Sequence, residues 1–176
     1  MKFVLGCVVT LLVIFGGAYL FVHLGLVSFR ADEAPGSFEQ KIAMQALDAS
    51  TDRHASSLKN PIQPTDANLI AGVQLYKSSC AGCHGDPSRP QSPEAHAFYP
   101  PVPQFMQDAP DMPDNSNFYI IKHGIKWTGM PGWENKLSDD DIWKVTTFLS
   151  QMTKLPPAVD QEWKSANARA SATTNK

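Results

Sequence analysis

The run Cys80-Ala81-Gly82-Cys83-His84 constrains this chain more than any other feature of its sequence. The pattern C-x-x-C-H is typical of covalent attachment of a c-type haem. Two thiols at this spacing can form thioether bonds to the two vinyl groups of one porphyrin, and the adjacent histidine can supply a neutral imidazole nitrogen to the iron. The motif therefore predicts one covalently bound haem c, held through Cys80, Cys83 and His84.

We expect Met130 to be the second axial ligand of the iron. It lies in the segment Gly129-Met130-Pro131-Gly132, where the glycines let the backbone come near the ring and the proline fixes the backbone just past the sulfur. Its position 46 residues after His84 lets the chain pass from one haem face to the other. A thioether is soft and uncharged, so it favours ferrous iron and fills the sixth coordination position. The chemistry that remains is outer-sphere transfer of one electron.

Other residues compete with Met130 for this role. His123 is the main alternative, since ligation by two histidines is common among haems, but it precedes Gly124 at the end of an apolar segment, where a surface position also suits it. Met152 lies on a helix face and is expected in the core. The remaining candidates lie in loops, and they are His96, Met106 and Met112.

The N-terminal segment predicts a membrane anchor over residues 1–30. Residues 3–29 form a run of 27 residues without a formal charge. A helix of this length reaches about 40 Å, whereas a bilayer core of about 30 Å needs about 20 residues. A cleaved signal peptide is the alternative, but the run is longer than the apolar region of a signal peptide and no A-x-A site follows it closely. Cys7 is expected to be a small apolar residue, and His23 an interfacial one.

Residues 31–64 are predicted to be a linker with a possible helix. Ser37 can cap a helix that runs toward Leu58, with a weak apolar stripe through Phe38, Ile42, Gln45 and Ala49. This helix lies on the following domain, lies on a partner, or serves as a tether.

Residues 65–154 are predicted to be a compact helical unit, and residues 155–176 a polar tail that frays from Asp160. Three helices are expected in the unit, from Thr65 or Asp66 to Ser79, over 117–123, and from a cap at Ser138 to the stop at 155–157, with a proline-rich loop over 87–113. Gly72 lies on the apolar face of the first helix, where a missing side chain lets another helix cross closely. A core of this size is marginal, and a buried haem would complete it, so the haem-free chain is expected to fold poorly.

Taken in order, these elements resemble a class I cytochrome c over about residues 65–154. The resemblance is carried by C-x-x-C-H-G at 80–85, by G-M-P at 129–131, and by L-S-D-x-x-I-W at 137–143. It implies an all-α fold of a few helices around a covalently bound haem, preceded here by one transmembrane helix. It also implies that the first and last helices cross, with Gly72 and Tyr76 against Val145 and Phe148, and that Cys80, Cys83, His84 and Met130 hold the haem and its iron.

With the anchor, the resemblance implies a membrane-tethered monohaem cytochrome of a bacterial respiratory chain. Because c-type haem is attached on the far side of the cytoplasmic membrane, the haem domain is expected on the periplasmic side. The expected partners are the lipid bilayer and the redox proteins that donate and accept electrons at the membrane. On this interpretation the protein is an electron carrier and not an enzyme by itself.

Two other functions that keep the haem stay open. The chain can be the haem-bearing subunit of a larger membrane dehydrogenase or oxidase complex, or it can be a haem ligand sensor or peroxidase, which needs an open sixth position. A thiol oxidoreductase would need a βαβ frame, and a zinc site would need a second ligand pair at suitable spacing. The formal net charge of −2 and the lack of a basic stripe give no indication of nucleic-acid binding.

Overall fold

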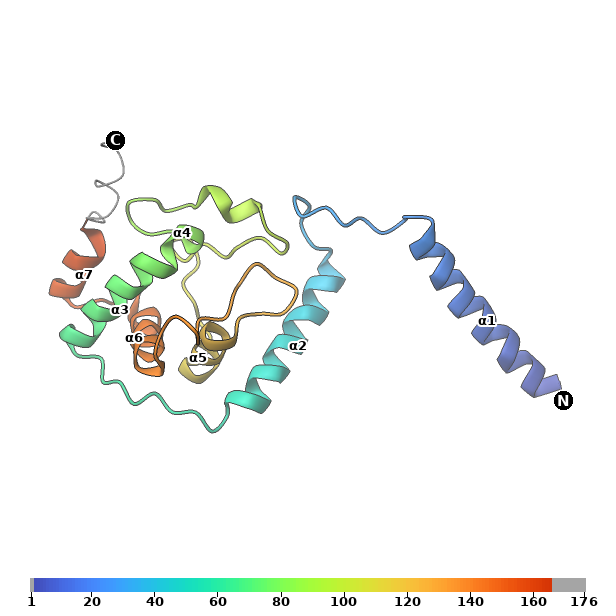
Figure 1. The fold of residues 1–176 in the computed structure, drawn as a ribbon, viewed down its shortest axis with the longest axis horizontal. Coiled ribbons are helices and arrows are strands. Elements are labelled where there is room, and N and C mark those ends of the chain that lie inside the picture. Colours follow the sequence, from blue (N-terminus) through green and yellow to red (C-terminus); the bar gives the residue numbers. More distant parts are fainter. Residues whose placement is uncertain (1, 166–176) are drawn as a thin grey trace. The chain divides into compact units, whose positions relative to one another are not determined.

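The computed structural model describes residues 2–165, and this part of the chain is helical without a β-strand. The described residues fall into two compact units, divided between Arg30 and Ala31. The all-α prediction is thereby confirmed. The helices are α1 (Lys2–His23), α2 (Ser37–Ala55), α3 (Asp66–Ser79), α4 (Ala81–His84), the 3₁₀-helix η1 (Pro93–His96), α5 (Asp114–His123), α6 (Asp139–Gln151) and α7 (Pro157–Lys164), as Figure 1 shows.

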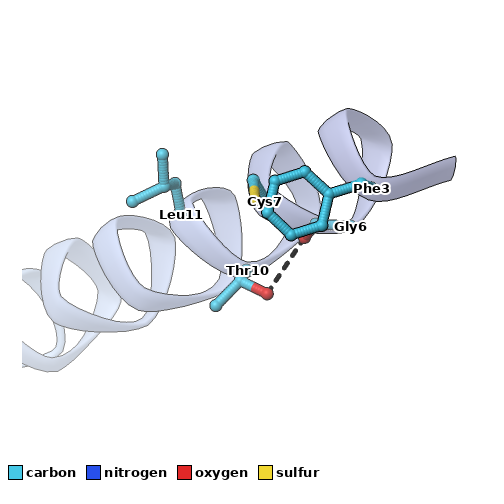
Figure 2. A pocket seen from close by; sticks show the side chains of 5 residues that line it. All are labelled: Phe3, Gly6, Cys7, Thr10 and Leu11. Atoms are coloured by element: carbon cyan, nitrogen blue, oxygen red, sulfur yellow. Dashed lines mark hydrogen bonds between the residues drawn. The ribbon is translucent and has the colours of Figure 1, made fainter. Parts of the chain in front are cut away.

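The first unit contains α1, which is long and apolar enough to cross a bilayer. It is 22 residues long, and an 18-residue window within it has a mean hydropathy of 2.4. At about 1.5 Å per residue, 22 residues reach roughly 33 Å. A signal sequence near the N-terminus meets the same criterion of length and apolar composition. The hydroxyl of Thr10 donates to the carbonyl of Gly6 at 3.0 Å (Figure 2), so this polar group is satisfied within the helix, as an apolar environment requires. A shallow hollow beside it is lined by Phe3, Gly6, Cys7, Thr10 and Leu11.

The core of the second unit is built on the crossing of α3 and α6. Gly72 is buried on α3, and a Cβ at this position would collide with the carbonyl oxygen of Lys144 and lie 2.9 Å from the Cβ of Phe148. One turn later, the rings of Tyr76 and Phe148 meet edge to face with centroids 5.5 Å apart. Val145 is fully buried in the same cluster. The predicted crossing of the two helices is confirmed, and glycine at position 72 is what allows it.

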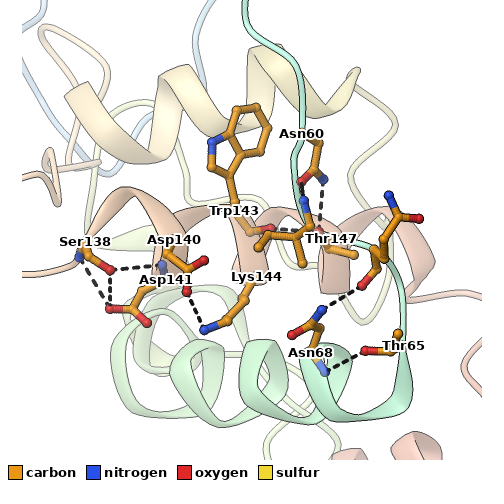
Figure 3. A network of polar contacts seen from close by, with 11 residues as sticks. Asn60, Thr65, Asn68, Ser138, Asp140, Asp141, Trp143, Lys144 and Thr147 are labelled. Atoms are coloured by element: carbon orange, nitrogen blue, oxygen red, sulfur yellow. Dashed lines mark hydrogen bonds and ion pairs between the residues drawn. The ribbon is translucent and has the colours of Figure 1, made fainter.

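A capping box begins α6 where the sequence predicts. The hydroxyl of Ser138 accepts from the Asp141 amide at 3.2 Å, and the Asp141 carboxylate accepts from the Ser138 amide at 3.4 Å. Two further acidic residues, Asp139 and Asp140, lie in the first turn, where the helix dipole favours negative charge. Figure 3 shows this cap at one end of α6 and the bonds of Asn60 and Thr147 nearer its other end.

Residues 31–64 belong to the second unit, because α2 packs on α5. Thr51 and Ala55 of α2 are buried, and the Asn115 amide of α5 donates to the Ala55 carbonyl at 3.0 Å. After α2, the side chain of Asn60 donates to Asp114 at 2.7 Å and to Thr147 at 2.9 Å. The sequence leaves open whether this helix lies on the following domain, lies on a partner, or serves as a tether. In the structure it lies on the domain that follows it.

The contact face of α2 differs from the face that the sequence indicates. Phe38 and Ile42, the large members of the predicted stripe, are 78% and 49% exposed. The face turned to α5 carries the small side chains of Thr51 and Ala55, which allow the helices to approach. Small residues at helical spacing give a weaker hydrophobic signal than Phe and Ile, so the sequence pattern points to the wrong face.

The prediction of a frayed tail from Asp160 is wrong for residues 160–164, which lie in α7. Its two prolines end the preceding segment and also begin this helix, since proline suits the first helical position. Val159 and Trp163 are buried, and the Trp163 ring lies 5.4 Å from that of Tyr76 and 5.0 Å from that of Phe148. The compact unit therefore extends beyond the predicted bounds 65–154 at both ends. Residues 166–176 of the predicted tail lie outside the described part of the chain.

We expect Trp163→Ala to lower the free energy of unfolding by about 3–5 kcal/mol, because it removes an aromatic ring from the centre of the core. Thermal unfolding of the purified protein measures the change. Lys164→Ala is the matched control, because it removes only an exposed ion pair with Asp160, worth at most about 1 kcal/mol. If both variants unfold at the temperature of the wild type, α7 does not contribute to the core.

Candidate functional site

The two cysteines and the histidine of the motif lie on a single turn at the end of α3. The amide of Cys80 donates to the carbonyl of Tyr76 at 2.7 Å, which continues the helix to this residue. The amides of Cys83 and His84 then both donate to the carbonyl of Cys80 at 3.0 Å, forming α4. Both thiols are free. The turn therefore gathers Cys80, Cys83 and His84 at one place on the fold.

Gly85 ends this turn immediately after His84. Its φ of +80° lies in the left-handed region that favours glycine, and its amide donates to the carbonyl of Ala81 at 3.0 Å. The buried hydroxyl of Tyr76 donates to the carbonyl of Gly85 at 2.8 Å. Burial raises the pKa of Tyr76, so the hydroxyl keeps the proton that makes this bond. The motif is thus tied to the aromatic core through Tyr76.

The Cys80 thiol is unsuited to exchange chemistry. Burial, with a smaller contribution from the nearby Cys83, raises the pKa of Cys80 to about 12. A thiol that attacks disulfides must be deprotonated at working pH, so this environment disfavours a thiol oxidoreductase. Among residues 2–165, no group of three or more His, Cys, Asp or Glu side chains could hold a metal ion. A zinc site built on this motif is therefore not formed in the described part of the chain.

His84 is held as a neutral imidazole with one nitrogen committed to the backbone. Its Nδ1 lies 2.9 Å from the carbonyl oxygen of Pro103, which can only accept, so Nδ1 carries the proton and Nε2 carries the lone pair. Burial lowers the pKa of His84, and the bond to Pro103 opposes this in part. The ring stacks on Phe105 with centroids 4.3 Å apart. A fixed tautomer with a free lone pair at Nε2 is the form in which a histidine binds a metal.

The segment 103–105 that holds His84 is itself tied to the motif. The amide of Phe105 donates to the His84 carbonyl at 3.1 Å, and the side chain of Gln104 donates to the Cys83 carbonyl at 2.9 Å. The side-chain oxygen Oε1 of Gln104 accepts from the Ser92 amide at 2.7 Å. Sequence reasoning missed these residues, because the bond that matters most is made by a backbone carbonyl.

Met130 lies on a loop between α5 and α6. It is half-buried and packs against the same hydrophobic cluster as Cys80 and Phe105. The Met130 carbonyl accepts from the Ile125 amide at 3.1 Å, and a Cβ on Gly124, which has a φ of +73°, would lie 2.7 Å from that carbonyl oxygen. Glycine at position 124 therefore allows the loop to fold back against the end of α5.

The turn before Met130 contains a strained residue. Trp127 has a φ of +62°, which costs a residue with a side chain about 1–2 kcal/mol, and it is 87% exposed. The ammonium of Lys126 lies 4.6 Å from the centre of its ring. No local pattern in the sequence indicates this backbone conformation, because Asn or Gly is the usual choice there.

The other candidates for the second iron ligand lie in surroundings that differ from those of Met130. His123 is exposed at the end of α5, with Nδ1 3.7 Å from a carboxylate oxygen of Glu134 and its ring 4.7 Å from that of Tyr119. Met152 follows α6 and lies with Phe105 in the lining of a small hollow. The remaining candidates are His96, exposed on η1, Met106, which is 37% exposed, and Met112, which is half-buried.

The residues present fit a covalently attached haem. A porphyrin with two vinyl groups needs two free thiols on one turn, and its iron needs a neutral imidazole nitrogen beside them. Cys80 and Cys83 supply the first, and the fixed tautomer of His84 supplies the second. The Met130 thioether lies on a separate loop of the same unit and packs against the same cluster.

The comparison with protein families agrees with this site. The family model described as cytochrome C oxidase, cbb3-type, subunit III matches residues 67–149. No curated protein matches. Among solved structures, a chain of the reducing HAO-like protein complex of Kuenenia stuttgartiensis is 25% identical with a TM-score of 0.45, over 52% of this chain and 46% of that one, so the match spans less than half of that chain's length.

The family match covers the segment that contains C-x-x-C-H, the Met130 loop and the crossing of α3 with α6. Residues 67–149 form a c-type cytochrome domain of the class I fold, with haem c as its covalently bound cofactor.

Proposed function

We propose that this protein is a membrane-anchored monohaem cytochrome that carries single electrons. In this proposal Cys80 and Cys83 bind the haem, His84 and Met130 ligate the iron, and α1 holds the domain at the periplasmic face of a bacterial cytoplasmic membrane. The observation that carries the proposal is the His84 side chain, whose Nδ1 bond to Pro103 leaves Nε2 as the metal-binding nitrogen beside two free thiols.

The residues around the iron define what the site can do. Haem c supplies a one-electron couple between ferric and ferrous iron. His84 keeps its proton on Nδ1, which donates it to the Pro103 carbonyl in a hydrogen bond, so transfer of an electron need not release a proton from this ring. The uncharged sulfur of Met130 favours the ferrous state and fills the coordination position that an exogenous ligand would need. These properties suit outer-sphere transfer and disfavour a ligand sensor or peroxidase.

A second candidate function is that of an electron-transfer subunit in a larger membrane oxidoreductase, such as a terminal oxidase in a respiratory chain. It is favoured by the description of the matching family as a subunit of a cbb3-type oxidase. The outward side chains Phe38 and Ile42 on α2 offer an apolar surface on which another subunit can pack.

Met130→Ala tests the proposed ligation. The variant should lose the sulfur-to-iron charge-transfer band of the ferric protein and should have a lower reduction potential, because the ligand that favours ferrous iron is gone. Visible spectroscopy with a redox titration measures both. Met152→Ala is the control and should keep both properties. Retention of the band and potential in Met130→Ala, or carbon monoxide binding by the reduced wild type, would contradict the proposal.

The double substitution Cys80→Ala with Cys83→Ala tests attachment. We expect no haem on a denaturing gel stained for peroxidase activity, and we expect the haem-free chain to be poorly folded, because a domain of this size has a marginal core without a buried cofactor. Far-ultraviolet circular dichroism and proteolysis measure the second effect. Substitution of Cys7 by alanine should leave both haem content and folding unchanged.

Native membranes distinguish the two candidate functions. A retained anchor predicts that the mature protein has the mass of a chain that includes α1 and resists extraction with alkaline carbonate. After extraction in mild detergent, a free electron carrier should migrate as a single small haem-staining band. Migration with other subunits would favour the second candidate, and a mature chain that begins after α1 would contradict the anchor.

A further inference from the structure

The loop that carries Met130 contains a hydroxyl group that bonds in two directions. The Thr128 Oγ1 donates to the carbonyl of Ile125 at 2.8 Å and accepts from the amide of Met130 at 3.1 Å. The backbone of the same residue donates to the Ile125 carbonyl at 3.2 Å, and the Ile125 amide donates to the Met130 carbonyl at 3.1 Å. Both backbone polar groups of Met130 are therefore fixed within six residues of chain.

The turn closed by these bonds has Trp127 at its third position, with a φ of +62°. Its side chain is 87% exposed, so packing against the core does not explain this conformation. Without the two hydroxyl bonds of Thr128, only backbone bonds oppose a relaxation at Trp127 toward negative φ. Met130 would move with such a relaxation because it lies only three residues further along the chain. The hydroxyl therefore opposes a local strain.

The rest of the loop limits the directions in which Met130 can move. The Phe98 ring of the proline-rich loop covers Gly129, where a Cβ would lie 2.8 Å from the ring carbon Cγ. On the other side, a Cβ on Gly132 would lie 2.9 Å from the His123 carbonyl oxygen. The neighbours of Met130 are thus packed on both sides. In the turn 125–128, the side-chain hydrogen bonds are those of the Thr128 hydroxyl.

We propose that Thr128 is a positioning residue for the axial ligand, holding the Met130 loop against the backbone strain at Trp127. The proposal rests on the proposed ligation of iron by Met130 and adds a requirement for a side chain that both donates and accepts. Threonine and serine meet this requirement. Valine has the shape of threonine but can neither donate nor accept, and it leaves the Met130 amide without this partner.

Imidazole titration of the ferric, full-length haem protein tests the proposal, because imidazole binds only where it displaces the native ligand. Thr128→Val should bind imidazole about tenfold more tightly than the wild type, the change expected when a hydrogen-bonding group is lost from a partly buried site. The charge-transfer band should weaken in parallel. Thr128→Ser should remain within about twofold of the wild type, since a serine hydroxyl makes both bonds.

A double-mutant cycle identifies the strain. Glycine adopts positive φ at little cost, so adding Thr128→Val to Trp127→Gly should change imidazole affinity much less than adding it to the wild type. If Thr128→Val fails to fold, Thr128→Ala takes its place in both comparisons. Equal imidazole affinity in wild type and Thr128→Val, an equally large effect in Thr128→Ser, or additivity in the cycle would overturn the proposal.

Met130→Ala distinguishes a failure of the Met130 ligation from a failure of the Thr128 positioning role. It should bind imidazole more tightly than any Thr128 variant, since no sulfur competes. If it binds imidazole no more tightly than the wild type, the ligation by Met130 is wrong and the role of Thr128 falls with it. If it binds tightly while Thr128→Val matches the wild type, only the role of Thr128 is overturned.

Discussion

The close contact of α3 with α6 at Gly72 sets the position of everything that follows it in the site. Because a Cβ cannot fit between this position and the Lys144 carbonyl, the two helix backbones approach more closely than any other residue would allow. The helix α3 runs directly from this contact into Cys80, so its direction determines where the C-x-x-C-H turn lies. Tyr76 extends the contact, because its ring packs on Phe148 and its hydroxyl bonds the backbone just past His84.

From that fixed end, the site is completed by loops and not by further helices. The proline-rich loop contributes the Pro103 carbonyl and the Phe105 ring to His84, and the loop after α5 presents Met130. Each loop is fixed by hydrogen bonds to the chain itself and by prolines that restrict φ. If these residues ligate iron as proposed, ligands held in this way would keep their positions when the charge on the iron changes, which is what a group that gains and loses single electrons requires.

Features with a local chemical signature could be predicted from the sequence. The C-x-x-C-H turn, the Met130 loop and the Ser138 cap each depend on a few neighbouring residue types, and Gly72 indicated the helix crossing. The rest depends on contacts that leave no such signature. His84 is fixed by the backbone carbonyl of Pro103, and every residue has such a carbonyl. The helix α2 is held by small side chains. The helix α7 begins at two prolines, which in a sequence can equally well indicate the end of a helix. Trp127 adopts a backbone conformation that its residue type disfavours.

The docking of α2 also bears on how an anchored carrier would work. Had residues 31–64 been a flexible linker, the haem domain could sample a wide region around its anchor. Because α2 packs on α5, only residues 24–36 separate α1 from the first helix of the compact unit, α2. Thirteen residues span at most about 45 Å when fully extended. If α1 remains in the membrane, as proposed, this length confines electron exchange to partners at the same membrane surface. A short tether raises the effective concentration of those partners and lowers the need for a high-affinity docking surface.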